Sequence, residues 1–183
     1  MTSTKNNLLI GTILVAFAAI LKVTTFPHSI NPIIAISLFS GAIFKDKKSA
    51  FAMPLLAMFV SDIMLELFNI APGFYGIGQV GNYASLLLVT ALGFGMKKIN
   101  PINVVGYSIA SSLLFFVLSN TNCFLFDNLN SYGTGILGWA NCLVAGIPFV
   151  KNGLAIDLCF SSILFGSYSL LLKKSFVKQA LPQ

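Results

Sequence analysis

Long apolar runs, broken only by short polar turns, most constrain how this chain folds. Six runs have a length at or near that of a membrane span: 8–25, 30–44, 49–70, 83–96, 101–120 and 153–172. A transmembrane helix needs about 20 mainly apolar residues. Of the 183 residues, 56% are hydrophobic and only 9% are charged. A soluble domain of this size cannot bury that much apolar surface. The sequence therefore predicts a single-domain, all-α membrane protein with about six transmembrane helices.

A seventh apolar stretch, 135–150, carries several glycines and the sequence Ile147-Pro148-Phe149. Glycine and proline are the residues that most often interrupt helices. We therefore expect a re-entrant or interfacial segment that leads into the last helix. A true span is the alternative.

The positions of the lysines predict the orientation of the chain. With six spans, nine of the eleven lysines fall on one side: Lys5, Lys45, Lys47, Lys48, Lys97, Lys98, Lys173, Lys174 and Lys178. Only Lys22 and Lys151 lie on or near the other side. Because cytoplasmic loops carry the excess of lysine, we expect a multi-pass protein of the cytoplasmic (inner) membrane with both termini in the cytoplasm. These lysines punctuate apolar runs, so the expected partner is the lipid bilayer and not nucleic acid.

Three acidic residues lie inside predicted spans, where a charge is costly unless it is paired. Asp62 and Glu66 are four residues apart on one helix face, at roughly 20 and 25 Å from the cytoplasmic end. Lys22 reaches a similar depth of roughly 21 Å, so it is the expected ion-pair partner. Asp157 is expected only about 6 Å below the outer surface. These charges form either the polar floor of an outward-facing pocket or a pair that only holds helices in register.

The sequence offers little to build an enzyme or a metal site. His28 is the only histidine, and the three cysteines show no CxxC spacing. No GxSxG, HExxH or P-loop pattern is present. We therefore expect no metal, no cofactor and no enzymatic activity, although an intramembrane enzyme that uses Asp62, Glu66 or Asp157 remains a rival hypothesis.

Several motifs resemble, over nearly the whole chain, an uncharacterised family of small bacterial membrane proteins. They are Asn31-Pro32 with Ala35, Leu38-Phe39 and Gly41-Ala42, then Ser61-Asp62, Leu114-Phe115-Phe116 to Asn120, Gly146-Ile147-Pro148-Phe149, and Asp157 with Leu164-Phe165-Gly166. In architecture that family resembles the substrate-binding S components of energy-coupling-factor vitamin transporters. The resemblance implies an S-component-like bundle of six helices, with a binding pocket capped by the outer loops. The first helix lacks the Ala-x-x-x-Ala pattern with which S components often dock on a shared membrane subunit. A solitary transporter is therefore an alternative to one coupled to an ATP-driven module.

The leading functional hypothesis is a membrane component that binds a vitamin-like organic micronutrient and helps to move it inward. The outer connections are long and rich in amides and aromatic residues, which suit stacking on a flat heterocycle. Six residues combine an outer position with suitable chemistry and lie within or beside the family-like motifs: Asn31, Asp62, Tyr75, Asn120, Trp139 and Asp157. The rival from a different class is a non-enzymatic structural or assembly subunit of a larger membrane complex.

Overall fold

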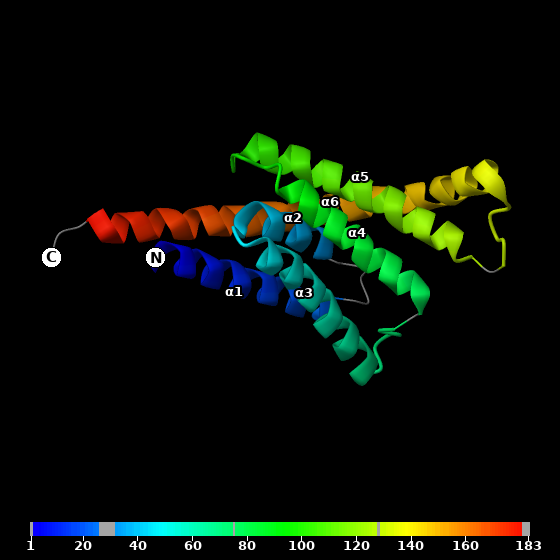
Figure 1. Cartoon of the computed structure of the whole chain (residues 1–183), viewed down its shortest axis with the longest axis horizontal. Coiled ribbons are helices and arrows are strands. Elements are labelled where there is room, and N and C mark those ends of the chain that lie inside the picture. Colours follow the sequence, from blue (N-terminus) through cyan, green and yellow to red (C-terminus); the bar gives the residue numbers. More distant parts are fainter. Residues whose placement is uncertain (1, 26–31, 75, 128, 181–183) are drawn as a thin grey trace.

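The computed structural model describes residues 2–25, 32–74, 76–127 and 129–180. The described residues form helices and no strand, which confirms the all-α class. The helices are α1 (Thr2–Thr24), α2 (Ile33–Ile43), α3 (Lys47–Leu67), α4 (Ile77–Gly93), α5 (Pro101–Leu125) and α6 (Gly135–Ala180). They run up and down along one long axis (Figure 1).

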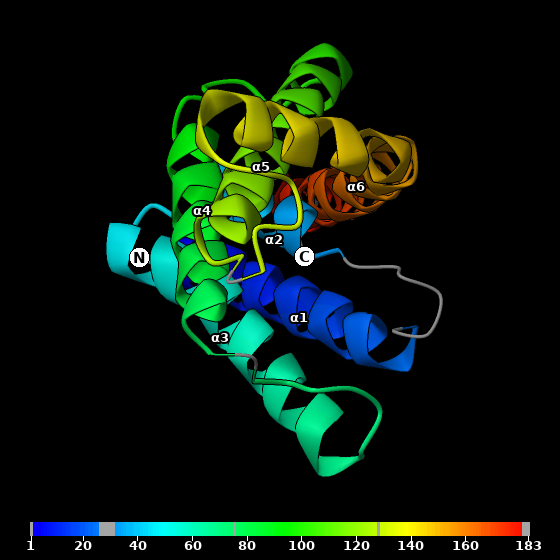
Figure 2. The same ribbon diagram turned by 90° about the vertical axis from the view of Figure 1, so that its right-hand side faces the viewer.

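The shortest helix, α2, lies in the middle of the bundle (Figure 2). It packs against each of the other five helices. Ile36, Leu38 and Phe39 are 0% exposed. The rings of Phe165 and Tyr168 on α6 meet the Phe39 ring edge-on, at centroid distances of 5.2 and 5.7 Å. A helix surrounded on all sides has no polar face, which explains why its sequence is apolar apart from the small buried residues Ser37 and Ser40.

Glycines bring the backbones of α2 and α4 into contact. A Cβ atom at Gly41 would collide with the carbonyl oxygen of Thr90, and a Cβ atom at Gly93 would collide with that of Leu38. Small residues at a crossing let two helices approach closely and gain van der Waals contact. This crossing therefore depends on both glycines.

Two helices begin at side-chain caps that follow short lysine-bearing turns. The Asp46 carboxylate accepts a hydrogen bond of 2.9 Å from the backbone N–H of Ser49 at the start of α3. The Asn100 side chain accepts one of 2.8 Å from the N–H of Asn103 at the start of α5, where Pro101 is the first helical residue. Such caps satisfy N–H groups that have no partner inside the helix.

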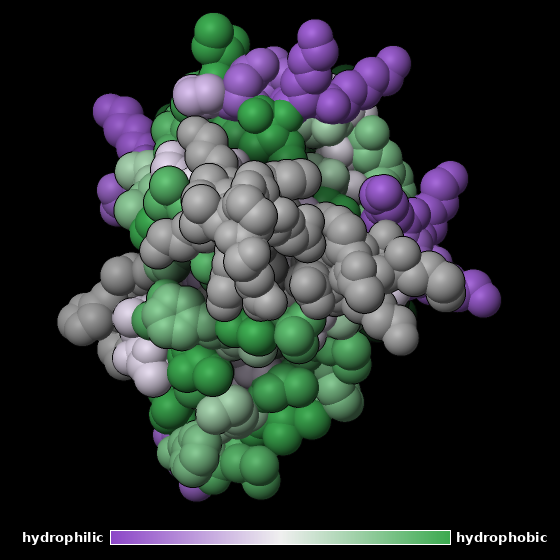
Figure 3. All heavy atoms as spheres, turned by 90° about the vertical axis from the view of Figure 1, so that its left-hand side faces the viewer, coloured by the Kyte–Doolittle hydropathy of each residue, from purple (hydrophilic) through white to green (hydrophobic). Residues whose placement is uncertain are grey.

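The two ends of the bundle differ in character. Both ends of the described chain lie at one end, together with the 44–46 and 94–100 connections, and we call this the lysine end (Figure 1). Its exposed lysines are Lys45, Lys47, Lys48, Lys97 and Lys98. Figure 3 views this end and shows hydrophilic residues along part of its rim. The described residues of the connections 68–76 and 126–134 lie at the opposite end, which we call the loop end.

Among the described residues, three helices are long and apolar enough to cross a membrane, α3, α5 and residues 135–171 of α6. By length and composition these are the helices of a membrane protein, but the structure does not support six full spans. At 1.5 Å per residue, the 11 residues of α2 and the 17 of α4 cover roughly 16 and 25 Å, less than the hydrocarbon thickness of about 30 Å. Helix α1, which includes side chains outside the described set, is not among the three.

The segment near 135–150 is not a separate re-entrant element, so the re-entrant form of that prediction was wrong, and an interfacial position for the segment stays a prediction. It forms the first part of α6, a continuous helix of 46 residues that contains Pro148. In membrane helices neighbouring groups satisfy the backbone carbonyl that a proline leaves unpaired, so a proline need not end the helix. The glycines of the 135–150 segment therefore do not end the helix. They lie where α6 packs closely against a neighbour or where it faces open space.

The orientation can be tested by cysteine labelling. In a background whose three native cysteines are replaced by alanine, Lys98→Cys should react with an impermeant maleimide only after the inner membrane is opened. Leu129→Cys, on a side chain that is 87% exposed at the loop end, should react from outside in intact spheroplasts. The reason is the excess of lysine at the lysine end. Labelling of Lys98→Cys in intact spheroplasts would contradict the orientation.

The glycine crossing predicts a second outcome. Gly41→Ala should lower the free energy of unfolding by about 1–3 kcal/mol, because the added methyl group overpacks the contact with α4. The matched control is Gly106→Ala on α5, where an added Cβ meets no atom within 4 Å. Denaturation in mixed micelles measures both variants. Equal stabilities for the two would show that α2 and α4 are not held by this contact.

Candidate functional site

A row of polar contacts joins the antiparallel helices α5 and α6. The hydroxyls of Ser108 and Ser161 lie 3.0 Å apart, and the Ser112 hydroxyl donates a hydrogen bond of 2.6 Å to Oδ2 of Asp157. Nearer the loop end, the Cys142 thiol lies 3.3 Å from the carbonyl oxygen of Asn120. Small serine side chains allow close approach, and their hydroxyls find partners across the interface.

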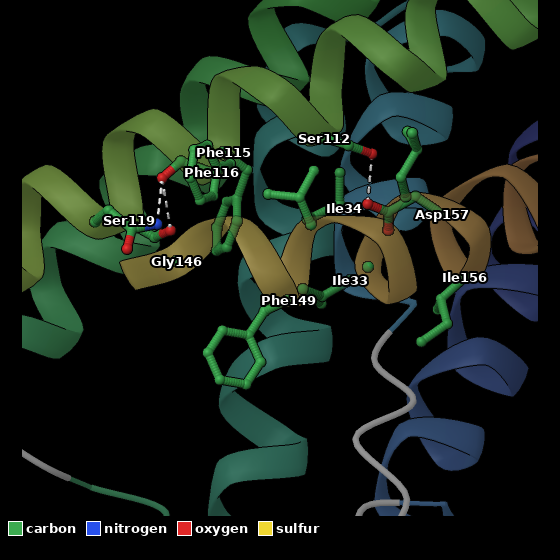
Figure 4. Close-up of a pocket in the computed structure, with 14 residues that line it drawn as sticks. Ile33, Ile34, Ser112, Phe115, Phe116, Ser119, Gly146, Phe149, Ile156 and Asp157 are labelled. Atoms are coloured by element: carbon green, nitrogen blue, oxygen red, sulfur yellow. Dashed lines mark hydrogen bonds between the residues drawn. The ribbon is translucent and has the colours of Figure 1, made fainter. Parts of the chain in front are cut away.

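A cavity of about 280 Å³ opens beside this row, between α5, α6 and the first turn of α2 (Figure 4). Its walls are mainly apolar and aromatic, with a few polar groups. They are formed by Ile33, Ile34, Ser112, Phe115, Phe116, Ser119, Asn120, Gly146, Phe149, Val150, Gly153, Leu154, Ile156 and Asp157. The volume is nearly twice the roughly 150 Å³ of an engineered cavity that binds benzene. The cavity can therefore hold one ring with a short side arm.

Asp157 is the charged group of this cavity. It is 2% exposed, and among the described residues Ser112 is its hydrogen-bond partner and no cation pairs with it. Its second oxygen, Oδ1, accepts no hydrogen bond from the described part of the chain. Ser112 lies 11 residues beyond the start of α5, or roughly 17 Å along that helix. Asp157 therefore sits beside the middle of α5, and the helix start at Gly153 from which its depth of about 6 Å was counted was wrong, because α6 begins at Gly135.

Asn120 closes the cavity toward the loop end. Its amide Nδ2 donates a hydrogen bond of 2.8 Å to the carbonyl oxygen of Phe116, one turn earlier in α5. A Cβ atom at Gly146 of α6 would lie 2.6 Å from Oδ1 of Asn120 and 2.7 Å from the Phe116 ring. Glycine at position 146 thus makes room for the amide and the ring.

Asp62 belongs to a different cluster, which fastens the α3–α4 connection. The 3%-exposed carboxylate accepts hydrogen bonds of 2.9 Å from Nε2 of Gln79 and 2.7 Å from the hydroxyl of Tyr83. Nε2 of Gln79 also donates to the carbonyl oxygen of Gly73, at 3.0 Å, and the N–H of Gly73 donates to Glu66, at 2.7 Å. These two carboxylates hold a loop against two helix ends, as a structural element would.

Among the described residues, the remaining sequence-predicted candidates lie away from the cavity. Asn31 and Tyr75 lie outside the described residues, as does the side chain of Lys22, so its pairing with Asp62 or Glu66 stays a prediction. Trp139 lies near the start of α6, where its indole N–H donates a hydrogen bond of 2.9 Å to the Thr121 hydroxyl. Of the four ligand candidates that the structure describes, Asn120 and Asp157 line the same cavity, and Asp62 and Trp139 do not.

Sequence reasoning missed Ser112 and the aromatic walls. Phe115 and Phe116 were noticed as part of a family-like motif, and Phe149 as part of another, but none was proposed as a wall of the site. The serines at 108 and 112 are spaced four apart, and that spacing places two hydroxyls on one helix face. This signal could have shown which face of α5 meets α6.

A second hollow, of about 720 Å³, lies at the loop end between α4, α5 and the α5–α6 connection. Its polar groups are largely engaged with the protein itself. Asn122 donates a hydrogen bond of 2.6 Å to the Gly78 carbonyl, and the Asp127 carboxylate accepts from the backbone N–H groups of Leu129 and Ser131. The described residues contain no group of three or more His, Cys, Asp or Glu side chains that could hold a metal ion.

The Asp62 cluster predicts losses of stability. Tyr83→Phe and Gln79→Leu each remove one donor from a buried carboxylate, so each should lower the free energy of unfolding by about 1–3 kcal/mol. Denaturation in mixed micelles measures the change. Tyr107→Phe, on a half-buried tyrosine outside this cluster, is the control. If Tyr83→Phe is no less stable than Tyr107→Phe, the hydrogen bond to Asp62 does not stabilise the fold.

Comparison with known proteins gives a family but no function. No curated protein and no solved structure matches the chain. One family model, described as a family of unknown function, matches residues 2–181 and therefore nearly the whole chain. The expectation of an uncharacterised family is confirmed, and nothing in the match links that family to S components. The chain belongs to this family of unknown function, DUF6580.

Proposed function

We propose that this protein binds a small organic molecule in the α2–α5–α6 cavity and helps to move it across the membrane. The main support for this proposal is a cavity of about 280 Å³ that combines aromatic walls with a buried carboxyl group and an amide. Ligand sites are mostly apolar, with a few polar groups that fix orientation. The lining of this cavity has that composition.

The chemistry of the lining favours binding over catalysis. Ser112 and Asp157 are a hydroxyl and a carboxylate in contact, but no histidine, lysine or cysteine lines the cavity among the described residues. A nucleophile needs a base held in place by a third group, or a metal ion. Phe115 and Phe116 instead offer ring faces for stacking.

The depth of the cavity favours entry from the loop end. Ser112 and Asn120 lie roughly 17 and 29 Å along α5, whose 25 residues start at the lysine end. If the lysine end is cytoplasmic, the cavity occupies the outer half of the membrane. A vitamin-like nutrient captured there would need either a gradient or an energising partner to move inward. An energy-coupling-factor-type module is such a partner.

The proposal can be tested without knowing the ligand. Protein purified in mild detergent should retain a small organic compound at near-stoichiometric amount, detected by mass spectrometry after denaturation. Gly153→Leu should lose that compound, because residue 153 lines the cavity and an added side chain meets open space there. The leucine side chain takes up part of the cavity, so a ring with a side arm no longer fits.

The matched control is Gly106→Leu, which adds the same side chain at an exposed position on α5 outside the cavity. It should retain the compound as the unaltered protein does. If Gly153→Leu and the unaltered protein yield the same small molecules, the cavity is not the binding site. A stoichiometric protein partner without any bound metabolite would favour a structural or assembly subunit instead.

A further inference from the structure

The geometry points to a ligand that carries a protonated nitrogen, and we propose that this cation pairs with Asp157 while the apolar body of the ligand packs against Phe115 and Phe116. This inference rests on the proposed function and names the chemical class of the ligand. Amines, amidines and protonated ring nitrogens all belong to that class.

The first observation is the unused oxygen of Asp157. Ser112 supplies one hydrogen bond, to Oδ2, and Oδ1 receives none from the described residues. A carboxylate has room for about four hydrogen bonds, and buried polar groups are nearly always satisfied. Since Asp157 is 2% exposed and lines the cavity, a molecule inside the cavity can supply the second donor.

The second observation is that the described residues lining the cavity include no other charged side chain. The residues of α2 that line the cavity are Ile33 and Ile34. Those of α5 are serines, phenylalanines and one asparagine. On α6 the nearest lysine is Lys151, which is exposed and does not line the cavity. A carboxylate at this depth is stable only when it is paired or protonated. A cationic ligand would supply the absent counter-charge.

The third observation is the spacing of the aromatic walls. Phe116 lies one helical turn beyond Ser112 on α5, about 6 Å along the axis. An amine held at Asp157 and a ring against Phe116 would therefore be separated by a two- or three-atom linker (Figure 4). Aromatic faces also attract cations, which adds to the same preference.

The experiment uses 2-phenylethylamine as the probe, because it has one ring, a two-carbon linker and a protonated amine. Two probes of nearly the same shape accompany it, the neutral 2-phenylethanol and the anionic 3-phenylpropionate. Binding to the detergent-purified full-length protein is measured at pH 7 by saturation-transfer NMR, up to 10 mM probe. The amine should bind at least tenfold more tightly than the alcohol, and the carboxylate should not bind.

Variants then assign the preference to one residue. Asp157→Asn should weaken amine binding at least tenfold and remove the preference over the alcohol. Asp127→Asn, at a half-buried acid of the loop end that does not line the cavity, should change neither. If Asp157→Asn does not fold, as judged by size exclusion and Trp139 fluorescence, Gly153→Leu serves instead. It keeps the carboxyl group and should abolish amine binding, while Gly106→Leu should bind normally.

Failures of the two proposals are distinguishable. Equal binding of alcohol and amine, or amine binding that survives Asp157→Asn within twofold, overturns the cationic preference but leaves a small-molecule site. Absence of binding by all three probes also overturns the inference as stated. The proposed function is judged separately, by whether a metabolite is retained by the unaltered protein and lost in Gly153→Leu.

Discussion

The burial of α2 is the constraint on which the rest of this structure depends. An 11-residue helix of roughly 16 Å cannot cross a bilayer by itself, and its backbone ends must be covered by protein. The other five helices surround it, and the contact of Gly41 with α4 brings the two backbones together. Because α2 occupies the centre, α5 and α6 must pack around it and against each other. The position of the cavity follows from this arrangement.

The cavity exists because side chains change size along the α5–α6 contact. Toward the lysine end, Ser108 meets Ser161 and Ser112 meets Asp157, so the helices approach closely. Toward the loop end, the α6 side of the cavity includes Gly153, where a Cβ atom would meet nothing within 4 Å. Protein interiors are otherwise filled to the density of organic crystals. A space of about 280 Å³ beside a tightly packed row is thus a local departure from that rule.

Hydropathy and lysine placement predicted the helical class and the common end of the lysine-bearing turns, because both follow from the cost of placing charge in lipid. The depth of a residue within the membrane was less predictable, because that depth is counted from the residue at which its helix begins. From the sequence we counted the last helix from Gly153 and so placed Asp157 near the outer surface. In the structure α6 begins at Gly135, roughly 27 Å earlier along the helix. Asn120 and Asp157 were predicted as site residues and do share a cavity. Their aromatic neighbours depend on tertiary packing, which a single sequence does not show.

The two buried aspartates differ in how much of their hydrogen-bonding capacity the described fold uses. Asp62 receives hydrogen bonds from Gln79 and Tyr83, and the same cluster holds the α3–α4 connection. That carboxylate is explained by the fold it stabilises. Asp157 receives one hydrogen bond, from Ser112, and turns its remaining capacity toward an apolar cavity. A fold gains little from a carboxyl group that is buried and only half satisfied, because an apolar residue of similar size would pack there without the desolvation penalty. The presence of the acid is accounted for when its second partner comes from outside the chain.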